Sequence, residues 1–307
     1  MRVLVTGGAG FIGSNFVRRL VNNSDHRVTV FDALTYAGNR ATLADLEESG
    51  SIDFVQGDIC DREAVASAMA GHDAVVHFAA ESHVDRSLLD PDVFVRTNCL
   101  GTNVLCDVAV GVGVERFIHI STDEVYGSID EGSFVETDRL VPRSPYSASK
   151  AGSDQIALAY HETYDLPVIV TRSSNQFGPY QFPEKLIPFF TTNLVRGNTV
   201  PLYGDGLNVR DWLFVSDNCE AVDLVLHSGE VGQIYNIGAG NEFTNRYHHG
   251  QAALPAGQGR ECCGVRRGPQ GTRPALFDSH RQGSAAGLET GPQLRRRARG
   301  DHSVLCR

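Results

Sequence analysis

The stretch Thr6–Gly13, TGGAGFIG, decides the fold of this chain of 307 residues. The apolar run Arg2–Val5 (RVLV) precedes it and predicts a buried strand, while residues 14–23 (SNFVRRLVNN) follow it with helical spacing. A strand, a glycine-rich turn and a helix in this order let the backbone approach a diphosphate and point the helix N-terminus at it. The stretch therefore predicts a dinucleotide-binding turn, with the spacing GxxGxxG at Gly7, Gly10 and Gly13.

Five more apolar runs alternate with helical segments; they read RVTVFD (27–32), IDFVQGD (52–58), AVVHFAA (74–80), VERFIHIST (114–122) and LPVIVTRSS (166–174). This alternation predicts βαβ units and a doubly wound parallel sheet, the Rossmann type of α/β fold. From Asn175 on, loops, short strands and helices mix. We therefore expect an NAD-binding Rossmann domain at residues 1–174. A smaller substrate-binding region, which includes returning Rossmann elements, is expected at residues 175–247.

Two acids at strand ends refine the prediction of which dinucleotide binds. Asp32 closes the second predicted strand, where a carboxylate accepts hydrogen bonds from both ribose hydroxyls and repels a 2′-phosphate. NAD is therefore favoured over NADP. Asp58 closes the third predicted strand, where a strand-end turn residue is the alternative interpretation.

A tyrosine and a lysine stand four residues apart in PYSASK, at Tyr146 and Lys150, and so share one face of a predicted helix. A neighbouring ammonium stabilises a phenolate, so we expect Lys150 to lower the pKa of Tyr146 and to let it take a hydroxyl proton. Taken alone, YxxxK is common on helix surfaces; the glycine turn upstream makes the catalytic interpretation the stronger one.

Two adjacent acids follow a buried strand in HISTDEVYG, where Thr122 precedes Asp123 and Glu124. They leave the carboxyl end of a parallel strand, which is where α/β sheets bind ligands. Two carboxyl groups at such a place suit coupled proton transfers, whereas an exposed acidic loop is the alternative.

These motifs resemble the extended short-chain dehydrogenase/reductase superfamily, also called the NAD-dependent epimerase/dehydratase family. Within it, TDEVYG, FAAESHVDRS, NQFGPYQFPEKLIP and PLYGDGLNVRDWLFV are similar to the dTDP-glucose 4,6-dehydratase family over residues 1–245. The resemblance implies a lyase with NAD as cofactor and dTDP-glucose as substrate, acting in deoxysugar synthesis. It implies catalytic roles for Thr122, Asp123, Glu124, Tyr146 and Lys150.

The same resemblance implies the other site residues. Those that contact the cofactor are Gly7, Gly10, Phe11, Ile12, Gly13, Asp32, Ala33, Leu34, Thr35, Asp58, Ile59, Phe78, Ala79, Ala80, Ser82, Thr97, Tyr146, Lys150 and Gln176. Those that contact the substrate are Ser82, Thr122, Asp123, Asn175, Lys185, Leu186, Pro201, Leu202, Tyr203, Arg210 and Asn245. The family has Asn-Asn-Tyr where this chain has Asn175-Gln176-Phe177, which alters the reach of one amide. A homodimer built from helices near residues 91–110 and 149–165 is also implied.

Composition excludes other classes. The net charge of −10 argues against a nucleic-acid partner, and no run of about 18 apolar residues predicts a membrane span. The cysteines before residue 245 are scattered, which favours reduced thiols in a cytoplasmic protein. No metal site is predicted.

The last 60 residues differ from the rest. Residues 1–245 carry 16 Lys+Arg and 33 Asp+Glu, a net charge of −17, whereas residues 246–307 carry 11 Arg and 4 acids, a net of +7. The tail shows no strand or helix periodicity. Possible codons for Gly268–Gln282, when they are read one base later, give DRKGHDLRYS, which resembles a family motif. The same offset in two other segments of the tail also gives sequences that resemble the family. We interpret residues 248–307 as frame-shifted and expect them to pack poorly.

Two alternatives stay open. Another nucleotide-sugar dehydratase, decarboxylase or epimerase would share most motifs, although the acid pair opposes it. A protein that still binds NAD but has lost its activity would agree with the altered sequence of the tail.

Overall fold

The computed structural model describes residues 1–129, 132–203, 206–244, 247 and 263–266. The chain divides into two compact units, each of which is described by itself. The first comprises Met1–Gly127, Val135–Ser173 and Val215–Ile237, and the second comprises Ser128–Phe134, Ser174–Phe214 and the segment from Gly238 on.

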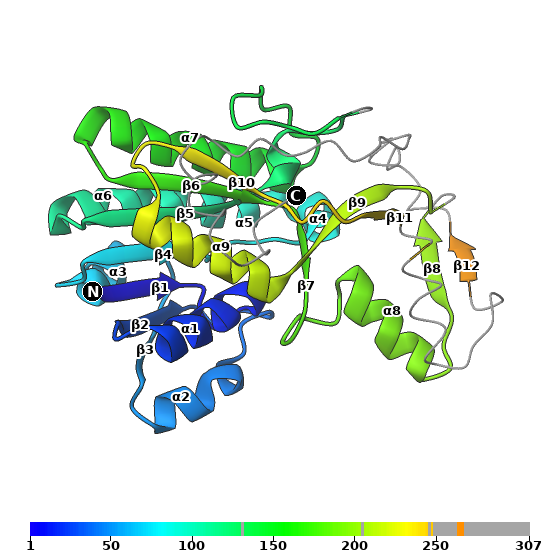
Figure 1. Cartoon of the computed structure of the whole chain (residues 1–307), viewed down its shortest axis with the longest axis horizontal. Coiled ribbons are helices and arrows are strands. Elements are labelled where there is room, and N and C mark those ends of the chain that lie inside the picture. The colour runs from blue at the N-terminus through cyan, green and yellow to red at the C-terminus, as the bar shows by residue number, and fades with distance from the viewer. Residues whose placement is uncertain (130–131, 204–205, 245–246, 248–262, 267–307) are drawn as a thin grey trace, which may run out of the picture. The chain divides into compact units, whose positions relative to one another are not determined.

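A parallel sheet of seven strands forms the first unit, in the order β10-β6-β5-β4-β1-β2-β3 (Figure 1). Every neighbouring pair in it is parallel. The strands are β1 Arg2–Thr6, β2 Arg27–Asp32, β3 Ile52–Gln56, β4 Ala74–His77, β5 Arg116–Thr122, β6 Val168–Ser173 and β10 Ile234–Ile237. The predicted doubly wound parallel sheet is therefore confirmed.

Helices cover both faces of this sheet (Figure 1). α1 (Phe11–Asn23) packs against α9 (Val215–Ser228), while α3 (Arg62–Met69) and α7 (Pro145–Tyr164) both pack against α6 (Thr102–Val112). Because both faces are covered, strand residues such as Val3, Val5 and Val76 are fully buried. The remaining helical elements are η1 Arg40–Leu43, α2 Ala44–Glu48, α4 Val84–Leu89, α5 Pro91–Phe94, the π-helical turn η2 Val95–Gly101 and η3 Asp123–Val125.

The sheet order reverses at β1, which lies between β2 and β4. In open α/β sheets the crevice beyond the carboxyl ends of the strands at such a reversal is where ligands bind. The glycine-rich turn follows β1 and residues Phe78–Ala80 follow β4, so both border this place.

Two small sheets and one helix make up the second unit. In the sheet β11-β9-β7, strand β9 (Val209–Phe214) pairs antiparallel with β11 (Glu242–Thr244) and parallel with β7 (Asn175–Phe177). α8 (Leu186–Val195) precedes β8 (Val200–Tyr203), which pairs parallel with β12 (Cys263–Arg266).

Strand β12 corrects one expectation about the tail, in which we predicted no strand. Cys263–Arg266 pairs with β8 through backbone groups, which every sequence carries whatever its side-chain pattern. The rest of the segment interpreted as frame-shifted, residues 248–262 and 267–307, lies outside the described residues.

Candidate active site

The glycine turn is shaped so that no side chain fits in it. Gly7 has a φ of +70°, and a Cβ added to it would lie 2.5 Å from the backbone nitrogen of Ala79. A Cβ on Gly13 would overlap the carbonyl oxygen of Gly7, and Gly10 caps α1 while its N–H donates to that same oxygen at 3.1 Å. The turn therefore presents bare backbone and the start of α1, which fits a diphosphate.

Asp32 at the end of β2 is held by two backbone donors. Its Oδ2 accepts from Ala9 N at 2.9 Å and its Oδ1 accepts from Leu34 N at 2.8 Å. Burial raises the pKa of this carboxyl group, and the two hydrogen bonds oppose that shift. A carboxylate has about four acceptor sites, so it can accept two more hydrogen bonds from a ribose.

The remaining predicted cofactor residues of the first unit follow the ends of neighbouring strands. Asp58 accepts from Cys60 N at 2.9 Å and lies 3.7 Å from the guanidinium of Arg96. Phe78 packs against Phe16 with 5.2 Å between ring centroids. Six others lie in the loops after β2, β3 and β4 or in η2, namely Ala33, Thr35, Ile59, Ala79, Ala80 and Thr97. The structure thus places most of these residues directly after the carboxyl ends of β2, β3 and β4.

Helix α7 begins with a capping box that fixes its first turn. Ser144 Oγ accepts from Ser147 N at 3.0 Å and Ser147 Oγ accepts from Ser144 N at 3.0 Å. Pro145 occupies the first turn, where its missing N–H costs nothing. Tyr146 and Lys150 follow on one face, and both are buried. Lys150 Nζ donates to the carbonyl oxygen of Ile120 on β5 at 2.8 Å.

The three residues at the end of β5 face Tyr146. Thr122 caps η3: its Oγ1 accepts from Glu124 N at 3.2 Å and donates to Asp123 Oδ1 at 3.2 Å. The Thr122 hydroxyl is also hydrogen-bonded to the phenol of Tyr146, and the charges of Glu124 and Asp123 act on that phenol. One phenol and two carboxyl groups therefore meet at this strand end.

The acidity of Tyr146 differs from our expectation. Burial, followed by the charge of Glu124, raises the pKa of Tyr146 well above its usual value. We expected Lys150 to lower this pKa, and for the protein's own groups that prediction is wrong. Lys150 donates to the carbonyl oxygen of Ile120, and the charges that act on the phenol are those of Glu124, Asp123 and Asp154. Burial lowers the pKa of Lys150 itself to about 8.

The other predicted substrate residues belong to the second unit. Arg210 lies opposite Phe243 of β11 in the β9–β11 pair, and its Nη1 donates to the carbonyl oxygen of Val209 at 2.7 Å. Gln176 lies on β7, and among the described residues its buried Oε1 has no hydrogen-bond partner, which fits a ligand contact. Asn175 also lies on β7, Lys185 and Leu186 start α8, and Pro201, Leu202 and Tyr203 lie on β8. Asn245 lies outside the described residues.

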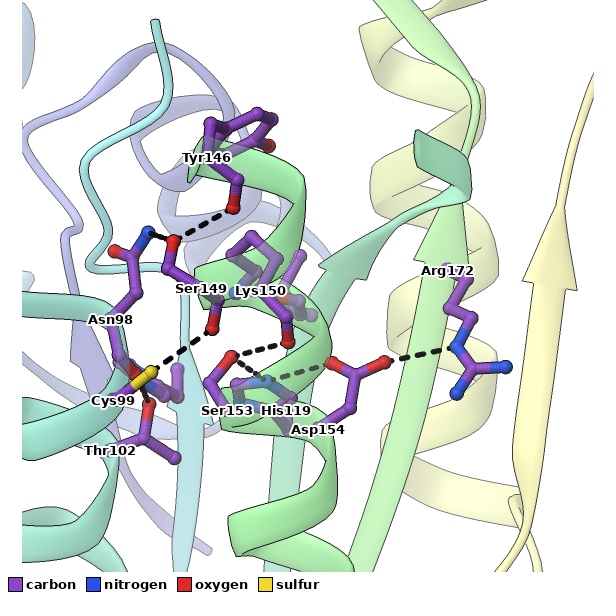
Figure 2. A network of polar contacts seen from close by, with 12 residues as sticks. Asn98, Cys99, Thr102, His119, Tyr146, Ser149, Lys150, Ser153, Asp154 and Arg172 are labelled. Atoms are coloured by element: carbon purple, nitrogen blue, oxygen red, sulfur yellow. Dashed lines mark hydrogen bonds and ion pairs between the residues drawn. The ribbon is translucent and has the colours of Figure 1, made fainter. Parts of the chain in front are cut away.

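Sequence reasoning missed two groups of polar residues around α7 (Figure 2). Asn98, in the π-helical turn η2, accepts from Glu81 N at 2.9 Å and donates to Glu81 O at 3.0 Å and to Ser149 Oγ at 2.8 Å. It therefore ties the loop that carries Ser82 to the helix that carries Tyr146. The second group consists of Asp154, His119 and Arg172. A polar residue inside an apolar strand, as in VERFIHIST, was the available signal.

In the part of the chain that the structure describes, no group of three or more His, Cys, Asp or Glu side chains could hold a metal ion. None of the helices among those same residues combines the length and the apolar character that a membrane span requires.

The fold, the glycine turn and the Tyr–Lys helix define an NAD-dependent enzyme of the extended short-chain dehydrogenase/reductase class. The chain belongs to the family described as GDP-mannose 4,6 dehydratase, whose sequence profile matches residues 4–270. That match continues past residue 245, where we placed the end of the resemblance.

Relatives of known name agree with this class. The chain is 55% identical over 250 residues to dTDP-glucose 4,6-dehydratase of Streptomyces niveus, an alignment that covers 80% of this chain and 74% of that protein. It is 56% identical over 245 residues to low-salt glycan biosynthesis protein Agl12 of Haloferax volcanii, with 80% and 79% covered. The crystal structure of DesIV, a dTDP-glucose 4,6-dehydratase from Streptomyces venezuelae with NAD and dTDP bound, has a TM-score of 0.86 at 53% identity, covering 89% of this chain and 86% of that one.

Proposed function

We propose that this chain is a dTDP-glucose 4,6-dehydratase, which converts dTDP-glucose to dTDP-4-keto-6-deoxyglucose with NAD as a bound cofactor. The observation that carries this proposal is the set of Thr122, Asp123 and Glu124 at the end of β5, facing the phenol of Tyr146. An oxidation at one carbon needs one proton acceptor, whereas removal of water from the next two carbons needs an acid and a base as well. Tyr146 on α7 and the carboxyl groups of Asp123 and Glu124 after β5 are three such groups.

The glycine turn, Asp32 and Lys150 would hold the cofactor. Bound NAD supplies a temporary hydride acceptor, and its nicotinamide adds a positive charge that favours the phenolate of Tyr146. That charge would oppose the burial and the carboxylates that otherwise keep Tyr146 protonated.

Each side chain then has one task. Tyr146 takes the proton of the sugar 4-hydroxyl as hydride leaves carbon 4, so that carbon 4 becomes a ketone, and Thr122 hydrogen-bonds near its oxygen. The ketone acidifies carbon 5, from which Glu124 removes the proton. Asp123 protonates the 6-hydroxyl, which leaves as water. Hydride then arrives at carbon 6 and carbon 5 is reprotonated, so one water is lost with no net oxidation.

In the second unit, Arg210 is the residue we assign to the diphosphate, because its planar fork of donors suits that anion. Asp211, next to it, accepts from Ala239 N at 2.8 Å and from Asn241 N at 2.7 Å. These bonds tie β9 to the turn before β11 and so hold the strand that carries Arg210.

The test is to incubate the full chain with dTDP-glucose, UDP-glucose and GDP-mannose and to follow loss of one water by mass spectrometry. We expect a 4-keto-6-deoxy product from dTDP-glucose. A 4-epimer without loss of water would contradict the proposal, and so would NAD binding without turnover of any of the three.

Structures of 4-epimerases share this fold: UDP-glucose 4-epimerase of Thermus thermophilus with NAD has a TM-score of 0.80 at 34% identity, covering 89% of this chain and 88% of that one. Our proposal against epimerisation rests on the acid pair.

We also propose that the chain forms a homodimer through η2 and α7. An open groove there is lined in part by Val95, Leu100 and Ile156, and Val95 and Leu100 are 54% and 49% exposed. Leu100→Glu should convert the dimer to a monomer in light scattering, while Val195→Glu on the exposed side of α8 should not. A monomeric wild type would overturn this proposal.

We further propose a cytoplasmic location, supported by the free thiols of Cys60, Cys99, Cys106 and Cys219. The frame shift near residues 246–251 likewise stays a proposal, supported by the reversal of charge in the tail. Sequencing the gene tests it, and an unbroken frame that encodes this tail would make the literal tail genuine.

A further inference from the structure

A buried cluster of charged and polar groups lies one helical turn beyond Lys150. Asp154 of α7 is completely buried, and its Oδ2 lies 3.0 Å from Nε of Arg172 on β6, which is 2% exposed. Its Oδ1 lies 3.2 Å from Nε2 of His119 on β5. Figure 2 shows Asp154 between His119 and Arg172, on the helix that carries Tyr146 and Lys150.

The cluster is joined to Lys150 through the helix backbone. Ser153 Oγ donates to the carbonyl oxygen of Lys150 at 2.8 Å and lies 3.1 Å from Nε2 of His119. His119 Nε2 thus lies within hydrogen-bond distance of both Ser153 and Asp154. Burial lowers the pKa of His119 to about 4, so this ring is neutral at pH 7 and carries one N–H. Its Nε2 is hydrogen-bonded to Ser153 Oγ, whereas Asp154 Oδ1 has no hydrogen-bond partner among the described residues.

Stability alone does not account for this arrangement. Buried ion pairs lose the hydration of both charges, and apolar residues of similar volume often replace them without loss of stability. Besides pairing with Arg172, the charge of Asp154 acts on Lys150. Lys150 is the neighbour that belongs to the catalytic set, and it shares a face of α7 with Asp154 because residues four apart on a helix lie on one face.

Lys150 is an ammonium in a setting that disfavours charge. Its Nζ donates to a neutral carbonyl oxygen, that of Ile120. Burial lowers its pKa, and the charge of Asp154 is the largest influence in the opposite direction. The other titratable or charged groups around it are His77 on β4, Cys99 on η2, His119 on β5, Arg172 on β6, Tyr146 on α7 itself, and Asp123 and Glu124 on η3, which act on Tyr146.

We propose that Asp154 is a positioning residue of the dehydratase reaction: its carboxylate, held by Arg172 and lying against His119, supplies the buried negative charge that keeps Lys150 an ammonium next to Tyr146. This inference rests on the proposed function for its catalytic consequence. The electrostatic link itself is a property of the protein and can be measured without substrate.

The sequence makes that measurement direct, since Lys150 and Lys185 are its only lysines. In protein labelled with ¹³C at the lysine side chain, NMR should show two ε-carbon signals, and Lys185→Arg assigns them. The Lys150 signal of the wild type should titrate near its pKa of about 8. In Asp154→Asn the midpoint should fall by about 1 pH unit or more, as expected when a close opposite charge is removed.

A second variant keeps the test decisive if Asp154→Asn does not fold, because that change leaves Arg172 buried without its carboxylate. Asp154→Asn combined with Arg172→Met removes both charges, and Lys150 should again titrate below the wild-type value. Asp223→Asn is the matched control, since Asp223 pairs with Arg19 at 2.9 Å on another helix. It should leave the Lys150 titration unchanged. A Lys150 midpoint in the folded double variant equal to that of the wild type would overturn the inference.

Kinetics separate this inference from the proposed function. If the wild type dehydrates dTDP-glucose, kcat should fall as pH rises through the Lys150 pKa, and in Asp154→Asn that fall should begin at lower pH. At pH 8 we expect about a fivefold or larger loss of kcat, because the protonated fraction of Lys150 falls from about one half to about one eleventh, with KM within twofold. An unchanged pH profile in the variant would overturn the inference about Asp154 but not the proposed function. A wild type that turns over no nucleotide sugar defeats the proposed function, while the NMR titration still decides the link between Asp154 and Lys150.

Discussion

At the scale of single residues, the site depends on what a position excludes as much as on what it contributes. Only glycine fits at position 13, because a Cβ there would overlap the Gly7 carbonyl oxygen. A Cβ on Gly111 in α6 would meet nothing within 4 Å. The two positions carry the same residue for different reasons, and only one of them lies at the cofactor.

Gly13→Ala should therefore lower the unfolding free energy by about 1–3 kcal/mol through overpacking, and it should reduce the NAD content of the purified protein. Gly111→Ala should raise stability by up to about 1 kcal/mol, because alanine favours the helix, and should leave NAD content unchanged. Urea unfolding and cofactor release on denaturation measure both quantities. Equal effects of the two changes would contradict this account.

Glu124 is the residue whose loss should separate oxidation from dehydration. Glu124→Gln keeps the shape of the side chain but removes the base, so kcat should fall by about 10²–10⁴ while NAD content is retained. Exchange of solvent deuterium into carbon 5 should fall by the same factor. Glu115→Gln, at an exposed position before β5, serves as the control and should retain wild-type kcat. Full activity of Glu124→Gln would assign the base elsewhere.

At the scale of elements, the start of α7 sets where Tyr146 points. The Ser144–Ser147 capping box closes the first turn, and Tyr146 lies inside that turn. A cap of comparable strength begins α3, where Asp61 Oδ1 accepts from Glu63 N at 3.0 Å and Ala64 N at 3.2 Å.

Ser144→Ala and Asp61→Ala should each cost about 1 kcal/mol of unfolding free energy, since each removes one helix cap. Only Ser144→Ala should also lower kcat, because only that cap adjoins the phenol. Thermal melts and steady-state kinetics on the same preparations make the comparison. A loss of kcat in both variants would point to general loosening of the fold.

At the scale of the whole molecule, buried neutral histidines make stability depend on pH. Burial lowers the pKa of His119 to about 4 and that of His77 well below 6.5, whereas both titrate near 6.5 when the chain unfolds. Between pH 6.5 and about 4 the unfolded chain thus binds protons that the folded chain does not. Stability must then fall as pH falls through that range.

Each of these histidines should add a slope of up to about 1.4 kcal/mol per pH unit to the unfolding free energy between pH 6.5 and 4.5. Urea unfolding at several pH values measures the slope, and His77→Gln should reduce it by up to one proton's worth. A flat profile over this range would show that the rings are charged in the folded protein.

Local patterns were enough to predict the central fold, and tertiary contacts account for what they missed. TGGAGFIG and the alternating apolar runs fix the sheet because turn geometry and strand periodicity are properties of neighbouring residues. The cluster of Asp154, His119 and Arg172 joins α7, β5 and β6, and the sequence does not state which residues meet across such elements. The predicted direction of the Tyr146 pKa shift was wrong for the same reason, since burial and the approach of Glu124 arise only on folding. Strand β12 depends on backbone pairing with β8, which carries no side-chain signature.

The return of the chain to the first unit has a consequence for biosynthesis. β6 ends at Ser173, but its partner β10 begins at Ile234, after the chain has passed through β7, α8, β8 and β9. On the ribosome, one edge of the nascent sheet therefore stays open until some sixty further residues have emerged. An open strand edge invites pairing with other chains. The interval of translation between β6 and β10 is thus a period in which the newly made protein is open to edge pairing with other chains.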